Sequence, residues 1–217
     1  MKKIYSLALI MCLMSIGVVS ATSFEPTKDS KVGSAQPSTN FGLGRYAMVN
    51  DKYIAKDRTY MEFDLSNVGN VNSAILQDYV YYTGNQAVNQ KVQAWFCPSK
   101  TFTETTINFN NQPSQWDVNG NPVTYTNHPL YWWKKVVNPG NGCTLADEYL
   151  ITNNVVAGSP ETKHTFDLTS EVNSDSDKKF VVVLKYKLEN VANNYRYVQY
   201  LAREYPEATF RPHLVVN

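Results

Sequence analysis

Residues 58–63 read Arg-Thr-Tyr-Met-Glu-Phe, and polar and apolar side chains alternate along this stretch. Successive side chains of a β-strand point to opposite faces, so alternation with a period of two is typical of a strand that buries one face. Similar strand patterns, alternating or rich in β-branched and aromatic residues, return at residues 74–82, 91–96, 163–168, 180–186, 195–202 and 213–216. We therefore predict that the chain folds almost entirely as β-strands.

Turn-forming residues separate these segments, for example Asn-Val-Gly-Asn at 67–70 and Pro-Gly-Asn-Gly at 139–142. No segment keeps a helical period over three turns, so the crossover helices of a parallel α/β fold are not found. The predicted fold class is all-β, a two-sheet antiparallel β-sandwich that is jelly-roll-like in outline. Residues 114–162 are polar and rich in turns, and we predict an elaborated loop insertion there.

The first 21 residues are organised like a secretory signal peptide. Lys2 and Lys3 precede an apolar run over residues 4–19, and small residues at the end suit cleavage after Ala21. The apolar run is shorter than the ~20 residues that span a bilayer, and an uncleaved membrane anchor is the alternative. We predict a signal peptide at 1–21, a single domain at 22–217, secretion to the outside or the cell surface, and no membrane association after cleavage.

Charge and cysteine content limit the classes of partner and the compartment. The chain has 20 Lys and Arg against 19 Asp and Glu, and without Lys2 and Lys3 the numbers are 18 against 19. A nearly neutral protein has no bulk electrostatic attraction to nucleic acid, so no nucleic-acid partner is expected.

After the signal peptide two cysteines remain, Cys97 and Cys143, and we predict a disulfide between them. Two separate buried thiols are the alternative.

Two groups of residues are candidate ligand sites. Aromatic rings stack on sugar faces and ammonium groups pair with uronate carboxylates or sulfates. The first group joins both kinds in one segment: Tyr131, Trp132, Trp133, Lys134 and Lys135. Its alternative role is to pack the insertion onto the sandwich. The second group is a basic set near the mature start that includes Lys28, Lys31 and Arg45, which are solvated surface charges in the alternative interpretation.

Charged residues also lie where the chain leaves one predicted strand and begins the last one. Arg203 and Glu204 end the strand pattern of residues 195–202, and Arg211 precedes the final strand. A guanidinium can bind a carboxylate and nearby carbonyls together, so we predict a structural clasp on the final strand. An anion-binding site is the alternative.

No cofactor is predicted. A structural calcium remains open, with Asp29 and Asp64 as oxygen ligands of the required type. Zinc is disfavoured because the histidines are tens of residues apart. The sequence contains no Gly-x-Ser-x-Gly and no His-Glu-x-x-His motif, so we predict no catalytic residues.

The motifs, taken in order, resemble the DNRLRE domain, also classed as carbohydrate-binding module family 96. Phe-Asp-Leu-Ser at 63–66, Phe-Asp-Leu-Thr at 166–169 and Arg203-Glu204 carry this resemblance. Further pieces lie at 24–32, 36–42, 73–76, 102–113 and 211–214. The chain departs from the family where Phe102 and Phe109 replace two tryptophans.

The resemblance implies a secreted, non-catalytic sandwich of a class attached to polysaccharide-degrading enzymes and cell-surface proteins. The expected function is binding of a polysaccharide, either acidic or from a cell wall. A structural or adhesive protein that self-associates in a wall, coat or matrix is the alternative. A polysaccharide-degrading enzyme is the least favoured class.

Overall fold

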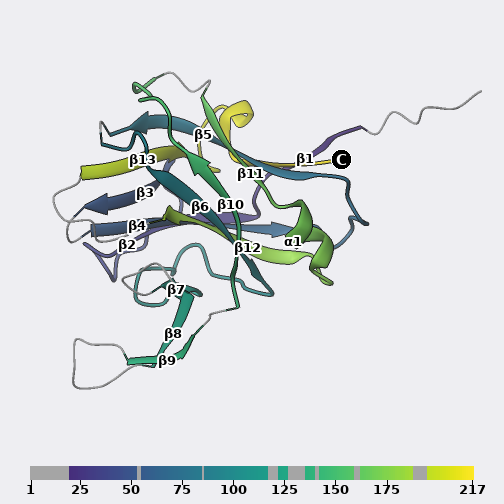
Figure 1. Cartoon of the computed structure of the whole chain (residues 1–217), viewed down its shortest axis with the longest axis horizontal. Helices are drawn as coiled ribbons and strands as arrows, with labels where there is room; N and C mark the ends of the chain where they lie inside the picture. Colours follow the sequence, from purple (N-terminus) through teal and green to yellow (C-terminus); the bar gives the residue numbers. More distant parts are fainter. Residues whose placement is uncertain are drawn as a thin grey trace, which may run out of the picture.

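The computed structural model describes residues 20–52, 55–84, 86–116, 122–126, 135–139, 142–158, 162–187 and 195–217. Within these ranges the chain is built mainly of β-strands (Figure 1). In chain order the elements are β1 (Thr22–Phe24), β2 (Lys28–Gly33), β3 (Tyr46–Lys52), β4 (Ala55–Asp64), β5 (Ala74–Thr83), β6 (Lys91–Pro98), β7 (Gln115–Trp116), β8 (Pro122–Thr126), β9 (Lys135–Pro139), β10 (Thr144–Leu150), β11 (Lys163–Asp167), α1 (Thr169–Ser174), β12 (Lys179–Tyr186), β13 (Tyr195–Leu201), the 3-10 helix η1 (Ala208–Phe210) and β14 (His213–Val216). Residues 1–19, most of the predicted signal peptide, lie outside the described part.

Eleven strands form one antiparallel sheet with the order β1-β14-β5-β13-β3-β4-β12-β6-β10, in which β11 also pairs with β5 and β2 with β4. This sheet is strongly curled into a half-barrel (Figure 1). The all-β prediction is confirmed, but the predicted two-sheet sandwich is not clearly formed. The reason is β4, whose residues 55–57 pair with β3 while residues 59–64 pair with β12. Hydrogen bonding therefore continues through β4 from one half of the sheet to the other.

Two edge strands of the curled sheet, β10 at one end and β11 beside β5, approach each other. The backbone N–H of Asp167 donates to Oδ2 of Asp147 at 2.9 Å. The Tyr149 ring stacks on the His164 ring with centroids 4.0 Å apart. Because the β-sheet twist accumulates over many strands, a sheet this wide curls on itself and can bury a core on its inner side.

All seven strands predicted from side-chain patterns are present, as β4, β5, β6, β11, β12, β13 and β14. In β5 the expected alternation holds, with Leu76, Asp78 and Val80 buried and the residues between them half-buried. In the main sheet the prediction missed β1, β2, β3 and β10, and it also missed the short strands β7, β8 and β9. The sequences of β2, β3 and β10 lack a dense run of β-branched or aromatic residues, and cross-strand pairing determines such strands.

The predicted insertion at 114–162 is more structured than a loop. It contains a separate three-stranded sheet, β7-β8-β9, that projects from the main sheet (Figure 1). It also contains β10, which pairs with β6 in the main sheet, with Thr144 opposite Phe96. The elaborated insertion thus contributes an edge strand to the main sheet.

The larger hydrophobic core contains a stack of aromatic rings. Phe180 lies between Phe96 and Phe63, with ring centroids 4.4 Å and 5.8 Å apart. Polar groups are also buried in the protein, and Nδ1 of His164 lies 2.8 Å from the hydroxyl of Tyr200. Burial lowers the pKa of His164 to about 3, so this imidazole is neutral at physiological pH.

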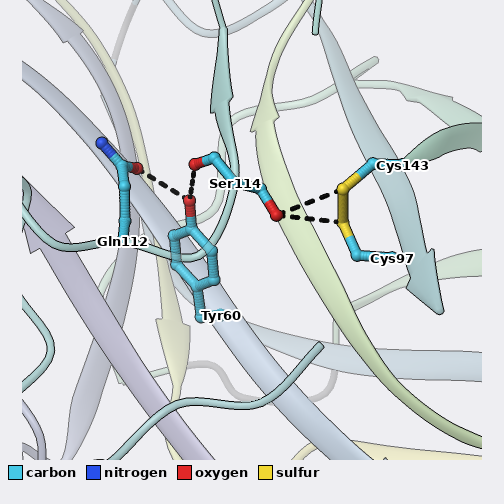
Figure 2. Close-up of a disulfide and its surroundings, with 5 residues drawn as sticks. All are labelled: Tyr60, Cys97, Gln112, Ser114 and Cys143. Carbon is cyan, nitrogen blue, oxygen red and sulfur yellow. Dashed lines mark hydrogen bonds between the residues drawn. A yellow bond between two sulfur atoms is a disulfide. The ribbon is translucent and has the colours of Figure 1, made fainter. Parts of the chain in front are cut away.

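A second core packs around a disulfide between Cys97 and Cys143, which confirms the predicted pairing. Figure 2 shows Ser114 beside it, with the Ser114 hydroxyl oxygen 3.4 Å and 3.1 Å from the two sulfurs. The Tyr60 hydroxyl lies 2.7 Å from both the carbonyl oxygen of Ser114 and Oε1 of Gln112 (Figure 2). The disulfide therefore ties the start of β10 to β6, and the Tyr60 hydroxyl holds the segment with Gln112 and Ser114 against β4.

Candidate functional site

Most of the predicted aromatic and basic segment cannot be placed. Tyr131, Trp132, Trp133 and Lys134 lie outside the described residues. Lys135 begins β9 and pairs with Thr126. This segment therefore stays a prediction.

The predicted basic set near the mature start does not come together at one place in the described part of the chain. Lys28 forms an ion pair with Glu62, with Nζ and Oε1 2.7 Å apart. Lys31 is three residues further along β2, so it points to the other face, and its Nζ lies 4.1 Å from the Phe41 ring centroid. Arg45 is exposed just before β3. A shared role for these residues stays a prediction.

The predicted clasp residue Arg203 lies among three carboxylates. Its Nη2 is 3.0 Å and 2.8 Å from the two oxygens of Glu104, and 2.9 Å from Oε1 of Glu204. Its backbone N–H donates to Oδ2 of Asp29 at 2.7 Å. Asp29 in turn donates its backbone N–H to Glu104 at 2.9 Å. These bonds join the end of β13 to β2 and to the loop after β6, while the clasp on the final strand stays a prediction.

The same three carboxylates are the closest approach to a metal site in the described residues. One oxygen each of Asp29, Glu104 and Glu204 lies within 4.8 Å of the others. Oxygen ligands of this kind suit calcium, but the Arg203 guanidinium already binds two of them. Asp64, the other residue considered for calcium, pairs instead with Lys179 at 3.0 Å. We assign no metal here.

Burial at this cluster has an electrostatic consequence. Asp29 is only 2% exposed, and this burial, together with Glu204 and Glu104, raises its pKa to about 8. Asp29 is therefore mostly protonated at neutral pH, which removes one negative charge from the cluster. The Arg203 guanidinium then faces two charged carboxylates, those of Glu104 and Glu204, instead of three, so the net negative charge of the cluster is smaller.

The last predicted clasp residue, Arg211, joins the two ends of the chain. Its Nε donates to the carbonyl oxygen of Tyr205 at 2.8 Å, and its Nη1 lies 3.3 Å from Oε2 of Glu25. Glu25 follows β1, which pairs with β14. Arg211 thus holds the chain just before the final strand, as a clasp requires.

Three motif positions have physical roles that the structure makes clear. Asp64 and Asp167 accept backbone N–H groups two residues later, from Ser66 at 3.0 Å and Thr169 at 2.9 Å, so each carboxylate stabilises a turn. Gly42 does not have a positive φ. A glycine is needed there because a Cβ would collide with the backbone carbonyl oxygen of Glu104.

A cationic pocket lies at the end of the half-barrel where β6 and β13 begin and β10 and β12 end. Its volume is about 300 Å³. The residues that line it are Asn89, Gln90, Lys91, Leu150, Tyr186, Lys187 and Arg196. Three of the seven carry a positive charge and none carries a negative one, so the pocket suits an anionic group. We call it the cationic pocket.

One carboxylate holds the two lysines of the cationic pocket in position. Nζ of Lys91 lies 2.7 Å from Oε2 of Glu148, and Nζ of Lys187 lies 3.0 Å from Oε1. The hydrogen bond from Lys91 is the main cause that lowers the pKa of Glu148 to about 2. The lysine side chains remain 44% and 48% exposed, so each ammonium still has donors available to a ligand.

The wall of the cationic pocket is held more rigidly than its lysines. Arg196 is buried and lies over the Tyr186 ring, with 5.3 Å between the guanidinium carbon and the ring centroid. Its Nη1 donates to Oε1 of Gln90. Leu150, 45% exposed, supplies an apolar side. The pocket therefore combines two exposed ammonium groups with a buried guanidinium, an aromatic ring and an apolar side.

No local sequence pattern indicates the cationic pocket. Lys91, Lys187 and Arg196 are far apart in the chain and belong to no motif. Each lies at or near the end of a predicted strand, and only the antiparallel pairing of the strands places those ends together. Knowledge of the strand order would have been needed to find the site.

Comparison with known families decides the class of the protein. Residues 20–136 match the sequence profile of carbohydrate-binding module family 96. The chain belongs to this family. The matched region extends from β1 to the start of β9 and includes Lys91, while β10, β12 and β13, which supply the rest of the cationic pocket, follow it. No curated protein matches the chain in sequence.

Membership of carbohydrate-binding module family 96 indicates a binding module rather than a catalytic domain, and implies a carbohydrate ligand of unspecified identity. A module of this kind with a disulfide fits an extracellular protein. Among the described residues, none of the helices has the length and apolar character needed to cross a membrane.

Proposed function

We propose that the chain is a secreted, non-catalytic module that binds an acidic polysaccharide, such as a uronate-containing polymer of a cell wall. The observation that carries the proposal is the cationic pocket, where Lys91, Lys187 and Arg196 surround a space of about 300 Å³. A cavity of that size accommodates a small ligand or one unit of a longer chain.

The chemistry of the cationic pocket favours a sugar that carries a carboxylate or a sulfate. The exposed ammonium groups of Lys91 and Lys187 can pair with such an anion by charge-assisted hydrogen bonds. Leu150 offers an apolar contact to the carbon face of the sugar, and the amides of Asn89 and Gln90 can bond to hydroxyl groups. A neutral sugar would leave Glu148 as the one carboxylate shared by the two ammonium groups, whereas an acidic sugar adds a second.

The predicted segment from Tyr131 to Lys135 is proposed as a further contact for the same polymer. The segment belongs to the insertion and is distinct in sequence from Lys91, Lys187 and Arg196, so its substitution tests a separate contribution. Trp132→Ala should weaken binding of the polymer without changing the charge dependence that the cationic pocket provides.

Affinity electrophoresis of the mature protein tests this function. Gels that contain polygalacturonate or alginate should retard the protein, and gels that contain a neutral β-glucan should retard it less. The double variant Lys91→Ala/Lys187→Ala should lose the retardation. Lys179→Ala is the matched control, because Lys179 also pairs with a carboxylate but lies at the opposite end of β12.

Two results would contradict the proposal. Equal retardation by neutral and acidic polymers would show that the cationic pocket does not select the ligand. New reducing ends or unsaturated uronates in the gel would show that the chain is an enzyme.

A further inference from the structure

The outer surface of three neighbouring strands carries a group of tyrosines. We call this group the tyrosine face, and its members are Tyr46, Tyr79, Tyr81, Tyr82, Tyr197 and Tyr205. They belong to β3, β5 and β13, which lie side by side in the sheet, and to the turn after β13.

Strand register shows that these rings share one side of the sheet. Tyr82 lies opposite Gln199, and Gln199 lies opposite Met48, so all three point to the same side. Tyr197 is two residues from Gln199, and Tyr46 is two residues from Met48. The residues between them, such as Val198, Tyr200 and Ala47, are buried on the inner side.

The rings of the tyrosine face support one another. The Tyr46 ring lies 4.7 Å from that of Tyr81 and 6.3 Å from that of Tyr205, measured between centroids. Tyr82 and Tyr197 form a second pair at 5.4 Å. Tyr46 is 36% exposed and the others are half-buried. Such rings are already fixed in place, so a ligand that stacks on them orders few side chains.

The tyrosine face adjoins the end of the half-barrel that holds the cationic pocket. Tyr197 directly follows Arg196, whose side chain points to the opposite side of β13. The backbone N–H of Gly84 donates to the carbonyl oxygen of Tyr197 at 2.9 Å, and the turn that begins at Gly84 leads to Asn89 and Gln90. One polymer chain could therefore contact both surfaces.

We infer that the tyrosine face is a second carbohydrate-binding surface, on which sugar rings of an extended polysaccharide stack. This inference rests on the proposed function, since it assigns the tyrosine face to further sugar units of the same polymer. Tyrosine offers a flat apolar ring and a hydroxyl, which match the carbon face and the hydroxyl groups of a pyranose. Among the other side chains that register places on this side, Met48, Asn50 and Gln199 are uncharged, and Lys163 lies opposite Tyr79 at one edge of the group. Stacking on the rings does not require an acidic group on the sugar.

Calorimetry with two hexasaccharides tests the inference, one a uronate oligomer and the other a neutral β-glucan oligomer. The variants are Tyr82→Thr/Tyr197→Thr, which removes two rings, and Tyr82→Phe/Tyr197→Phe, which keeps them. The loss of two stacking rings should lower the affinity for the uronate oligomer about tenfold, at both low and high salt. The phenylalanine variant should bind within about twofold of wild type, because the stacking rings remain. Thermal unfolding of both variants checks that the fold is intact.

The outcomes separate this inference from the proposed function. If the threonine variant binds the uronate oligomer as wild type does, the tyrosine face is not a ligand surface, while the function of the cationic pocket stands. If wild type binds neither oligomer, both proposals fail. If wild type forms dimers in sedimentation that the threonine variant abolishes, with oligomer affinity unchanged, the face is a contact between copies of the chain and the inference is overturned. ¹³C-labelled tyrosine resonances that shift on addition of the neutral oligomer to wild type, and not to the threonine variant, would support it directly.

Discussion

Asp29→Asn should reduce the loss of folding stability that we expect as pH rises from 5 to 8. Burial raises the pKa of Asp29 to about 8 from its ordinary 3.8. Between these pH values the folded protein holds a proton that the unfolded chain has released. The contribution of Asp29 to the free energy of unfolding is therefore fully present below pH 3.8 and is lost as pH rises through 8. Asparagine is neutral at every pH and can still accept the backbone N–H of Arg203, so it removes the dependence and keeps the contact.

The size of this effect follows from the pKa shift. One pKa unit corresponds to about 1.4 kcal/mol, so three pH units between 5 and 8 give at most about 4 kcal/mol of lost stability. Rearrangement around Arg203 and Glu204 reduces this, and about 2 kcal/mol is a reasonable expectation. For a domain of this size that amounts to a shift of melting temperature of about 4–8 °C.

Urea unfolding of wild type and Asp29→Asn at pH 5, 6, 7 and 8 measures the effect. The free energy of unfolding of Asp29→Asn, minus that of wild type, should increase as pH rises. Taking the difference cancels the opposite contribution of His164, which is neutral when folded and gains a proton when unfolded below pH 6.5. Asp64→Asn is the matched control, because Ser66 and Lys179 lower the pKa of exposed Asp64 to about 2 and it stays ionised throughout this range. A constant difference between wild type and Asp29→Asn across the range would refute the reasoning.

Three further predictions concern the clasp, the disulfide and Gly42. Arg203→Ala should lower the free energy of unfolding by about 2 kcal/mol, because it leaves Glu104 and Glu204 without their cation; a change below ~0.5 kcal/mol would argue against the clasp. Replacing Cys97 and Cys143 by alanine opens a loop with a sequence separation of 46 and should cost about 3–4 kcal/mol in urea unfolding, whereas an unchanged midpoint would mean that the pair adds no stability. Gly42→Ala should destabilise the fold by about 2 kcal/mol, because its Cβ meets the backbone of Glu104, while Gly69→Ala, with open space around it, should change stability much less.

Side-chain patterns predicted the strands but not how they are joined into a sheet. Alternation and β-branched runs identified β4, β5 and β12 because one face or both faces of these strands are buried. The distinction between two separate sheets and one curled sheet depends on β4, where residues 55–57 and 59–64 pair with different partners. No local pattern encodes that choice, because it depends on the order of strands in space.

The same limit explains why sequence reasoning singled out Arg203, Glu204 and Arg211 for a proposed clasp and did not point to the cationic pocket. Arg203, Glu204 and Arg211 lie close together in the chain, so their unusual charge at strand ends was visible. Their partners Asp29, Glu104 and Glu25 could not be named, because they come from distant segments. Lys91, Lys187 and Arg196 look like ordinary strand-end charges until the strands are ordered. Gly42 is a further case, since its close approach to the backbone of Glu104 depends on a distant segment and has no local sequence pattern.

The most direct test of the account is the affinity of the mature protein for a trimer of uronate sugars, measured by calorimetry at 50 mM and 500 mM salt. Wild type should bind, and Lys187→Ala should bind about tenfold more weakly at low salt, since a lost charge-assisted hydrogen bond is worth about 1.5 kcal/mol or more. High salt should narrow this difference because both lysines are exposed. Lys179→Ala should bind as wild type does. Equal affinity of wild type and Lys187→Ala for the trimer at low salt would contradict the claim that the cationic pocket holds an acidic sugar.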